Sequence, residues 1–137
     1  MSNKKSYIIG GLVGFVILIG IAFVVLGGAM KKEKLLVIPE TATVAKITKD
    51  GNKQEIAGDK LKQLREEIVN LEVSEFGITS PGEYEGILVQ FYENDTECAW
   101  FRIIDQETIW DFSEVLEKGN IIIYKTDVDL LELISKY

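Results

Sequence analysis

The chain has 137 residues, with 15 basic side chains, 22 acidic side chains and no His. All 22 acids and 11 of the bases lie in residues 33–137, so this part has a net charge of −11, which repels nucleic acid and anionic lipid head groups. The lack of His removes the usual general base near neutral pH and the commonest metal ligand. A single cysteine, Cys98, excludes an intrachain disulfide.

Residues 7–29 form an apolar stretch without a charged side chain. A helix of this length is about 35 Å long, enough to cross a hydrocarbon core of about 30 Å. The sequence therefore predicts a short basic tail over residues 1–6 and a transmembrane helix over residues 7–30, with the lipid bilayer as its partner. The alternative is a cleaved signal peptide, whose apolar region is usually shorter, about 7 to 15 residues.

Basic residues flank both ends of this stretch. Lys4 and Lys5 precede it, and Lys31, Lys32 and Lys34 follow it. Cytoplasmic flanks are usually richer in Lys and Arg, so the two ends nearly balance. A short basic tail before a long apolar run favours a C-terminal domain outside the cytoplasm, and the cytoplasmic orientation is the alternative.

Two glycines inside the apolar stretch, Gly10 and Gly14, have the GxxxG spacing. Small residues at this spacing allow two membrane helices to approach closely. They are therefore candidate helix-dimerisation residues, although glycine is also common in membrane helices generally.

Residues 31–34 form a connector, and residues 35–137 are predicted to form one small domain. Asp50 and Gly51 favour a hairpin turn, because a type I′ turn needs positive φ at both central positions. Strands are expected over residues 43–49 and 53–56, one on each side of that turn. Asp59 is the expected N-cap of a following helix, whose apolar stripe comprises Leu61, Leu64, Ile68 and Leu71.

The remaining elements follow in quick succession. An extended segment over residues 72–79 is expected to point Val73 and Ile78 inward. Strands are expected over residues 84–92, 97–104, 107–112 and 121–125, with one helical turn over residues 113–118. Thr126 is the expected cap of a final helix with Val128, Leu131 and Ile134 inside. The fold class is thus α+β: an N-terminal transmembrane helix followed by an antiparallel β-sheet with two helices on one face.

No constellation of catalytic, cofactor-binding or metal-ligating residues is found. Glu93, Asp95 and Glu97 alternate as in a calcium loop, but the glycine and closing glutamate of an EF-hand are missing. Trp100 and Trp110 lie five positions on either side of the expected Asp105–Gln106 turn. They are expected to be cross-strand neighbours, either as a sheet-stabilising pair or as an aromatic contact surface for a peptide or glycan.

The end of the chain resembles a known family. The residues GNIIIYKTD at 119–127, followed by DLLELI at 129–134, resemble the closing strand and helix of a small domain of unknown function. That family is found in membrane-anchored and lipoprotein-like proteins of Gram-positive bacteria, and the likeness covers about residues 36–137. The chain departs from it by a transmembrane anchor where a lipidated cysteine is often present. The resemblance implies a location and no chemistry.

The sequence as a whole predicts a single-pass, membrane-anchored, non-enzymatic binding or accessory domain outside the cytoplasm. Its partner would be a protein, a peptide or an envelope component, contacted near residues 84–112. The alternatives are a cytoplasmic-facing membrane subunit of a larger complex and a carboxylate-based hydrolase.

Overall fold

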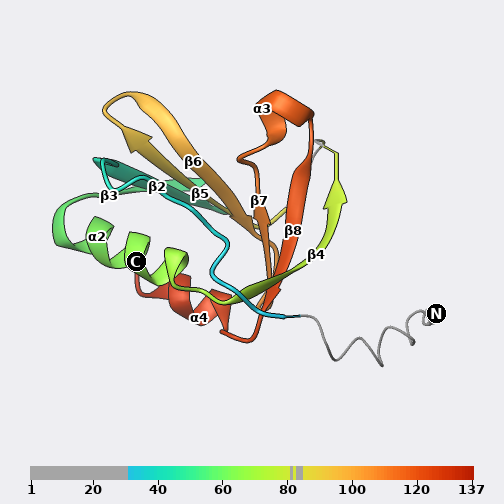
Figure 1. Ribbon diagram of the computed structural model, residues 1–137. Coiled ribbons are helices and arrows are strands. Elements are labelled where there is room, and N and C mark those ends of the chain that lie inside the picture. Colours follow the sequence, from blue (N-terminus) through green and yellow to red (C-terminus); the bar gives the residue numbers. More distant parts are fainter. Residues whose placement is uncertain (1–30, 81, 83–84) are drawn as a thin grey trace, which may run out of the picture. The chain divides into compact units, whose positions relative to one another are not determined.

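A seven-stranded antiparallel sheet is the centre of the structure, a computed structural model that describes residues 31–80, 82 and 85–137 (Figure 1). The chain from Lys32 to Tyr137 forms one compact unit. The order of strands across the sheet is β3-β2-β5-β6-β7-β8-β4. Three helices accompany the sheet in the described chain, so the fold is α+β, as the sequence predicts.

The strands and helices follow one another as a hairpin, a helix, a meander and a final helix. The strands are β2 (Val44–Lys49), β3 (Asn52–Ile56), β4 (Val73–Thr79), β5 (Ile87–Glu93), β6 (Thr96–Ile103), β7 (Thr108–Asp111) and β8 (Ile121–Thr126). The helices are α2 (Gly58–Val69), α3 (Val115–Lys118) and α4 (Leu130–Ser135). Strands β5 to β8 form the meander, while β4 pairs with β8 and closes the edge opposite β3.

The turn between β2 and β3 has the predicted geometry. Asp50 has a φ of +52° and Gly51 a φ of +82°, so both central residues are in the left-handed region. This confirms the hairpin and fixes its register, in which Lys49 lies opposite Asn52.

Side chains at alternate positions of the strands fill the core. Alternate residues of β5 and β6 are all buried: Ile87, Val89, Phe91, Ala99, Phe101 and Ile103. Phe91 and Phe101 meet edge to face, with ring centroids 6.4 Å apart. At about 25 cal/mol per Å² of buried apolar surface, rings of this size are among the largest single contributions to the core.

Helix α2 packs on the sheet through the predicted stripe of Leu61, Leu64 and Ile68. The predicted cap is wrong: the N-cap is Ala57, with no side-chain hydrogen bond, and Asp59 lies inside the first turn. Gly58, with a φ of +66°, carries the chain into the helix two residues earlier than the cap pattern indicates. The Asp59 carboxylate still lies where the positive end of the helix dipole favours it.

The final helix, in contrast, begins later than predicted. Its N-cap is Asp129, whose carboxylate accepts a hydrogen bond from the Glu132 N–H at 3.1 Å. Thr126 belongs to β8 instead, and its hydroxyl donates to the Glu72 carbonyl at 3.0 Å. The inner stripe shifts accordingly: Leu130, Leu133 and Ile134 are buried, while Val128 and Leu131 are exposed.

Strand β4 differs from the prediction at one position. Val73 is buried as expected, but Ile78 is 58% exposed. The register with β8 shifts between Glu75 and Gly77, which marks a β-bulge on this edge strand. Ile78 lies opposite Ile122, beyond the bulge, where it remains exposed.

Helices α2 and α4 lie together on one face of the sheet, and the C-terminus lies beside α2 (Figure 1). Lys136 and Tyr137 both donate hydrogen bonds to the Glu67 carboxylate on α2. Helix α3 lies at the other end of the sheet, between β7 and β8, and ends at Gly119 with a φ of +70°. The two-helix layer of the predicted fold thus corresponds to α2 and α4.

The predicted transmembrane stretch at residues 7–29, including Gly10 and Gly14, lies outside the described residues. Within residues 31–80, 82 and 85–137, no helix is long and apolar enough to span a membrane.

The contact between Glu67 and the C-terminus predicts a pH-dependent stability. Burial raises the pKa of Glu67, but the hydrogen bonds from Lys136 and Tyr137 outweigh it and hold the pKa below its ordinary value of 4.5. A carboxylate with a lowered folded pKa stabilises the fold above its unfolded pKa, and this contribution is lost as the pH falls through the folded value. Glu67→Gln should therefore reduce the free energy of unfolding by about 1 kcal/mol at pH 7, and the difference should shrink between about pH 5 and pH 3.

Urea unfolding at pH 7, 5 and 3, followed by tryptophan fluorescence, measures this difference. Glu66→Gln is the matched control, because Glu66 is exposed on the same helix. A Glu67→Gln effect of constant size over the pH range would contradict the assignment.

Candidate functional site

The sheet face opposite α2 and α4 carries the candidate site, and we call it the open face. Its members are identified by register, because directly opposite residues in an antiparallel pair project to the same side. One row runs across the sheet from Lys46 through Gln90 to Trp100. The next row comprises Thr48, Leu88, Arg102, Trp110 and Ile123. Glu55 and Lys53 of β3 continue these two rows, so the open face spans strands β3 to β8.

The two tryptophans lie on the open face but are not directly opposite one another. Trp110 pairs with Arg102, so Trp100 is displaced from Trp110 by two residues along β6. Trp100 instead stacks on Phe112, with ring centroids 4.4 Å apart and an interplanar angle of 13°. Both tryptophans are half-buried, so each leaves part of its ring on the surface.

Lysines on the open face lie over aromatic rings. Lys46 Nζ is 4.8 Å from the Tyr92 ring centroid, and Lys125 Nζ is 5.1 Å from that of Phe76. Lys125 also donates to the Thr108 hydroxyl at 2.8 Å. In the described chain, none of the ion pairs within 4.0 Å involves Lys46, Lys125 or Arg102. Their nearest carboxylates are farther away: Glu55 lies opposite Lys46 on β3, and the charge of Lys125 contributes to lowering the pKa of Asp105.

The charge of the open face is opposite to that of the chain. Among the described strand residues, register places two acids on this face, Glu55 and Glu97. The bases that share it are Lys46, Lys53, Arg102 and Lys125. Glu97 accepts a hydrogen bond from Gln90 at 2.8 Å, which occupies part of its carboxylate. A net positive surface thus lies on a domain whose total charge is −11.

Three buried side-chain atoms in the described residues have no hydrogen-bond partner: Thr48 Oγ1, Trp100 Nε1 and Arg102 Nε. All three lie on the open face. Buried polar groups are nearly always satisfied, and leaving one unsatisfied costs about 1–3 kcal/mol. Each of these groups can donate a hydrogen bond. The open face therefore contains three donors without an acceptor in the described chain, each covered by neighbouring protein atoms.

A hollow of about 480 Å³ lies at one end of the open face, lined by Thr48, Leu88 and Arg102 among others. Gly86 forms part of its wall, with a φ of +121°. A Cβ added at Gly86 would lie 2.5 Å from the Ile103 carbonyl oxygen. The close approach of the chain at Gly86 to β6 therefore requires glycine.

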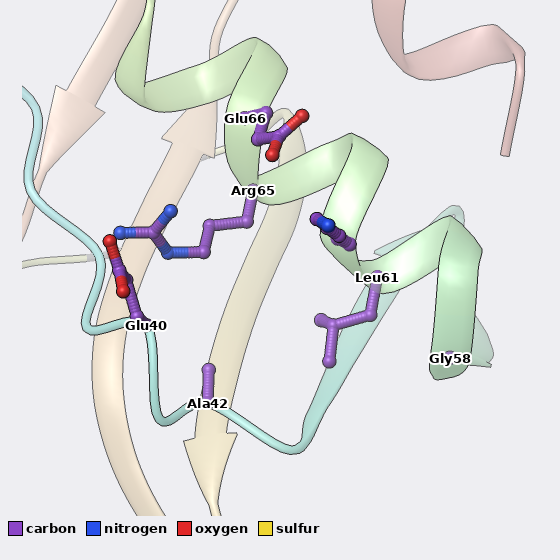
Figure 2. Close-up of a pocket in the computed structure, with 7 residues that line it drawn as sticks. Glu40, Ala42, Gly58, Leu61, Arg65 and Glu66 are labelled. Atoms are coloured by element: carbon purple, nitrogen blue, oxygen red, sulfur yellow. The ribbon is translucent and has the colours of Figure 1, made fainter.

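A second hollow, of about 420 Å³, lies beside α2 and contains two carboxylates, those of Glu40 and Glu66 (Figure 2). Arg65 reaches from α2 toward the segment that carries Glu40, and its Nη2 donates to the Ile38 carbonyl at 2.7 Å. Its Nε also donates to the Ile38 and Pro39 carbonyls. Arg65 therefore holds the segment at Ile38 and Pro39 against α2 through hydrogen bonds.

A carboxylate-based hydrolase needs one carboxyl that keeps its proton near neutral pH, usually through burial or a neighbouring carboxylate. Glu40 and Glu66 are both exposed. The hollow beside α2 is thus lined by two carboxylates, but neither has the burial that such chemistry requires.

A buried acid lies on the helix-bearing side of the sheet, near α3. Asp111 is 5% exposed, and burial raises the pKa of its carboxyl, against a hydrogen bond from the Ser113 N–H at 2.9 Å. Burial also raises the pKa of Tyr124 to about 12, with a further contribution from Asp111. This environment favours the neutral phenol, and Asp111 accepts a local turn hydrogen bond.

Two sequence features lie at or near the β5–β6 turn. Cys98 lies half-buried beside the irregularity in β6, where burial and the nearby Glu93 raise the pKa of its thiol, so it is a poor nucleophile. Glu93, Asp95 and Glu97 surround the β5–β6 turn. Among the described residues, no group of three or more His, Cys, Asp or Glu side chains could hold a metal ion.

Thr48 and Arg102 were not singled out as site residues from the sequence. Strand alternation does place Arg102 on the same side as Trp100. Its relation to Thr48 depends on the pairing of β2, β5 and β6, which no local pattern indicates.

The wall of the hollow gives a stability prediction. Gly86→Ala should lower the free energy of unfolding by about 2–4 kcal/mol, because the new Cβ meets backbone and the positive φ is strained. Gly77→Ala is the matched control, since a Cβ there meets nothing within 4 Å. Urea midpoints of the two variants measure the difference, and equal midpoints would contradict the close packing at Gly86.

Comparisons with known proteins add no relative. The sequence matches no family model, no curated protein and no solved structure. The likeness of residues 119–134 to a membrane-associated bacterial domain therefore stays a prediction.

Proposed function

We propose that this protein is a membrane-anchored, non-enzymatic binding domain that captures an acidic polypeptide segment on its open face. The observation that carries the proposal is the charge of that face: among the described strand residues it holds four bases and two acids, on a domain with a net charge of −11. In the described chain, Lys46, Arg102 and Lys125 form no ion pair within 4.0 Å.

The partner's chemistry follows from the groups that the open face presents. Its unpartnered atoms are donors, and its bases outnumber its acids. Aromatic and arginine side chains at the centre of a surface are the residues that most often dominate binding energy. An extended chain with carboxylates and apolar groups complements all three features.

The proposed location rests on the sequence. The apolar stretch at residues 7–29 would anchor the chain, and its short basic tail favours a domain outside the cytoplasm. The second candidate is a cytoplasmic-facing subunit of a membrane complex, favoured by Lys31, Lys32 and Lys34 on the other flank.

A protease experiment separates the two locations. Cells that express the full chain with an epitope after Tyr137 should lose the epitope when protease is added outside. Inverted membrane vesicles should keep it. Protection in intact cells, with cleavage only in inverted vesicles, would support the cytoplasmic-facing alternative.

A binding experiment tests the open face. Trp100 and Trp110 are the two tryptophans of the sequence, so intrinsic fluorescence reports on this face directly. The full chain in a neutral detergent should bind poly-glutamate with a change in tryptophan emission. Replacing Lys46 and Lys125 together by Glu should weaken binding about tenfold or more, since it reverses the charge of the face.

The matched control replaces Lys60 and Lys62 by Glu. Both are exposed on α2, on the other side of the sheet, and the change in net charge is the same. Equal losses in the two double variants would show a general charge effect and contradict the docking face. Tighter binding of polyphosphate than of poly-glutamate, at equal charge concentration, would contradict a polypeptide partner.

A further inference from the structure

We infer that a third hollow, at the α3 end of the open face, receives one apolar side chain of about leucine size from the polypeptide that binds this face. This inference rests on the proposed function and adds an apolar anchor residue to the acidic segment. The hollow has a volume of about 160 Å³, and its lining includes Trp100, Phe112, Val115 and Leu116. We call it the aromatic hollow.

Two stacked rings form one wall of the aromatic hollow. The Phe112 N–H donates to the Trp100 carbonyl at 3.0 Å, which extends the pairing of β6 and β7 beyond Asp111. The two side chains therefore lie next to each other, with ring centroids 4.4 Å apart. Phe112 is buried, whereas Trp100 is half-buried and leaves part of its ring accessible. This wall is formed before a ligand binds, so little freedom is lost on binding.

Helix α3 adds aliphatic surface to the aromatic hollow. The Val115 N–H donates to the Phe112 carbonyl at 3.0 Å, which ties the start of α3 to the residue that stacks on Trp100. Leu116 is 96% exposed, more than any other large hydrophobic residue in the part of the chain that the structure describes. A single exposed leucine is common on protein surfaces, but this one borders a concave surface with two aromatic rings. An apolar group that enters there removes water from its own surface and from Leu116 together.

The lining favours a neutral apolar group of limited size. Among the described lining residues, Glu97 is the only charged one, and its carboxylate accepts a hydrogen bond from Gln90. A carboxylate is therefore repelled from the aromatic hollow, while an aliphatic side chain needs no polar partner there. A closed apolar cavity of about 150 Å³ holds one benzene molecule. The aromatic hollow thus has room for one side chain of about four to six carbon atoms.

The position of the aromatic hollow fits an acidic segment that runs across the strands. Gln90 lies opposite Lys46 on one side and Trp100 on the other, so Lys46 and Trp100 are two strand spacings apart, about 10 Å. Residues two apart in an extended segment project to the same side and are about 7 Å apart. A carboxylate two residues from the apolar anchor therefore comes within reach of the Lys46 side chain.

The experiment compares three blocked nonapeptides on the full chain in a neutral detergent. All have the pattern Glu-Thr-Glu-Thr-X-Thr-Glu-Thr-Glu, with Leu, Ser or Lys at the central position X. The Leu peptide should bind about tenfold more tightly than the Ser peptide, because only leucine gains from leaving water. It should also shift the tryptophan emission to shorter wavelength, because Trp100 lines the hollow and loses water there. The Lys peptide should bind more weakly than the Leu peptide.

A variant of the exposed leucine tests the hollow without disturbing the core. Leu116→Ser should leave the urea midpoint unchanged, because the side chain is 96% exposed. Its affinity for the Leu peptide should fall about threefold to tenfold, with no change for the Ser peptide. Val37→Ser is the matched control, because Val37 is 75% exposed and precedes Ile38, whose carbonyl binds Arg65 of α2. This control should leave both affinities unchanged.

The outcomes distinguish the two proposals. Equal binding of the Leu and Ser peptides, or equal losses in Leu116→Ser and Val37→Ser, would overturn the aromatic hollow and leave the acidic docking face standing. A Lys peptide as tight as the Leu peptide would overturn the apolar chemistry of the hollow. A dimer of the full chain that Leu116→Ser dissociates would overturn the assignment to a polypeptide partner. Failure of the parent chain to bind any of the peptides or poly-glutamate would overturn both proposals.

Discussion

The whole domain depends on a sheet that is covered by helices on one side only. Helices α2 and α4 bury the inward side chains of β5 and β6, and Phe91 and Phe101 meet beneath them. Because successive side chains of a strand project to opposite faces, the burial of one set fixes the position of the other. The core therefore determines which side chains lie on the open face, although the open face contributes little to the core.

This constraint explains which side chains the open face can carry. A sheet face without a helical layer must combine apolar surface with polar ends, as lysine, arginine and tryptophan do. Lys46 over Tyr92 and Lys125 over Phe76 are such pairs. The ladder beneath holds them on a rigid support, so the face presents an ordered array of donors and cations.

The sequence predicts well the features that depend on near neighbours. Asp50 and Gly51 determine their turn, and the alternation around Val89 and Phe101 determines which side is buried. The sequence predicts poorly the features that depend on contacts among several strands and helices. A bulge puts Ile78 on the same side of the sheet as Val73, yet Ile78 is exposed there. Asp129 caps α4 in place of Thr126, whose hydroxyl donates to the Glu72 carbonyl of a distant segment.

The candidate site also combines features that the sequence predicts with features that it does not predict. The shared face of Trp100 and Trp110 follows from alternation and the turn between them, whereas their offset depends on the register that β7 adopts. The hollow joins Thr48 to Arg102, 54 positions apart in the sequence, through a strand that pairs with both. Only the complete sheet brings these two residues together.

The charge of the domain and the charge of its open face act over different distances. A net charge of −11 repels an acidic partner, but salt at physiological strength limits this repulsion to about 8 Å. Contacts to Arg102, Lys46 and Lys125 act within hydrogen-bond and van der Waals distance, where salt screens the charges only weakly. An acidic segment is then held only when its carboxylates meet these side chains, and it is repelled from the rest of the surface. The net negative charge of the domain makes an acidic partner unexpected. The same charge would restrict the binding of such a partner to the open face.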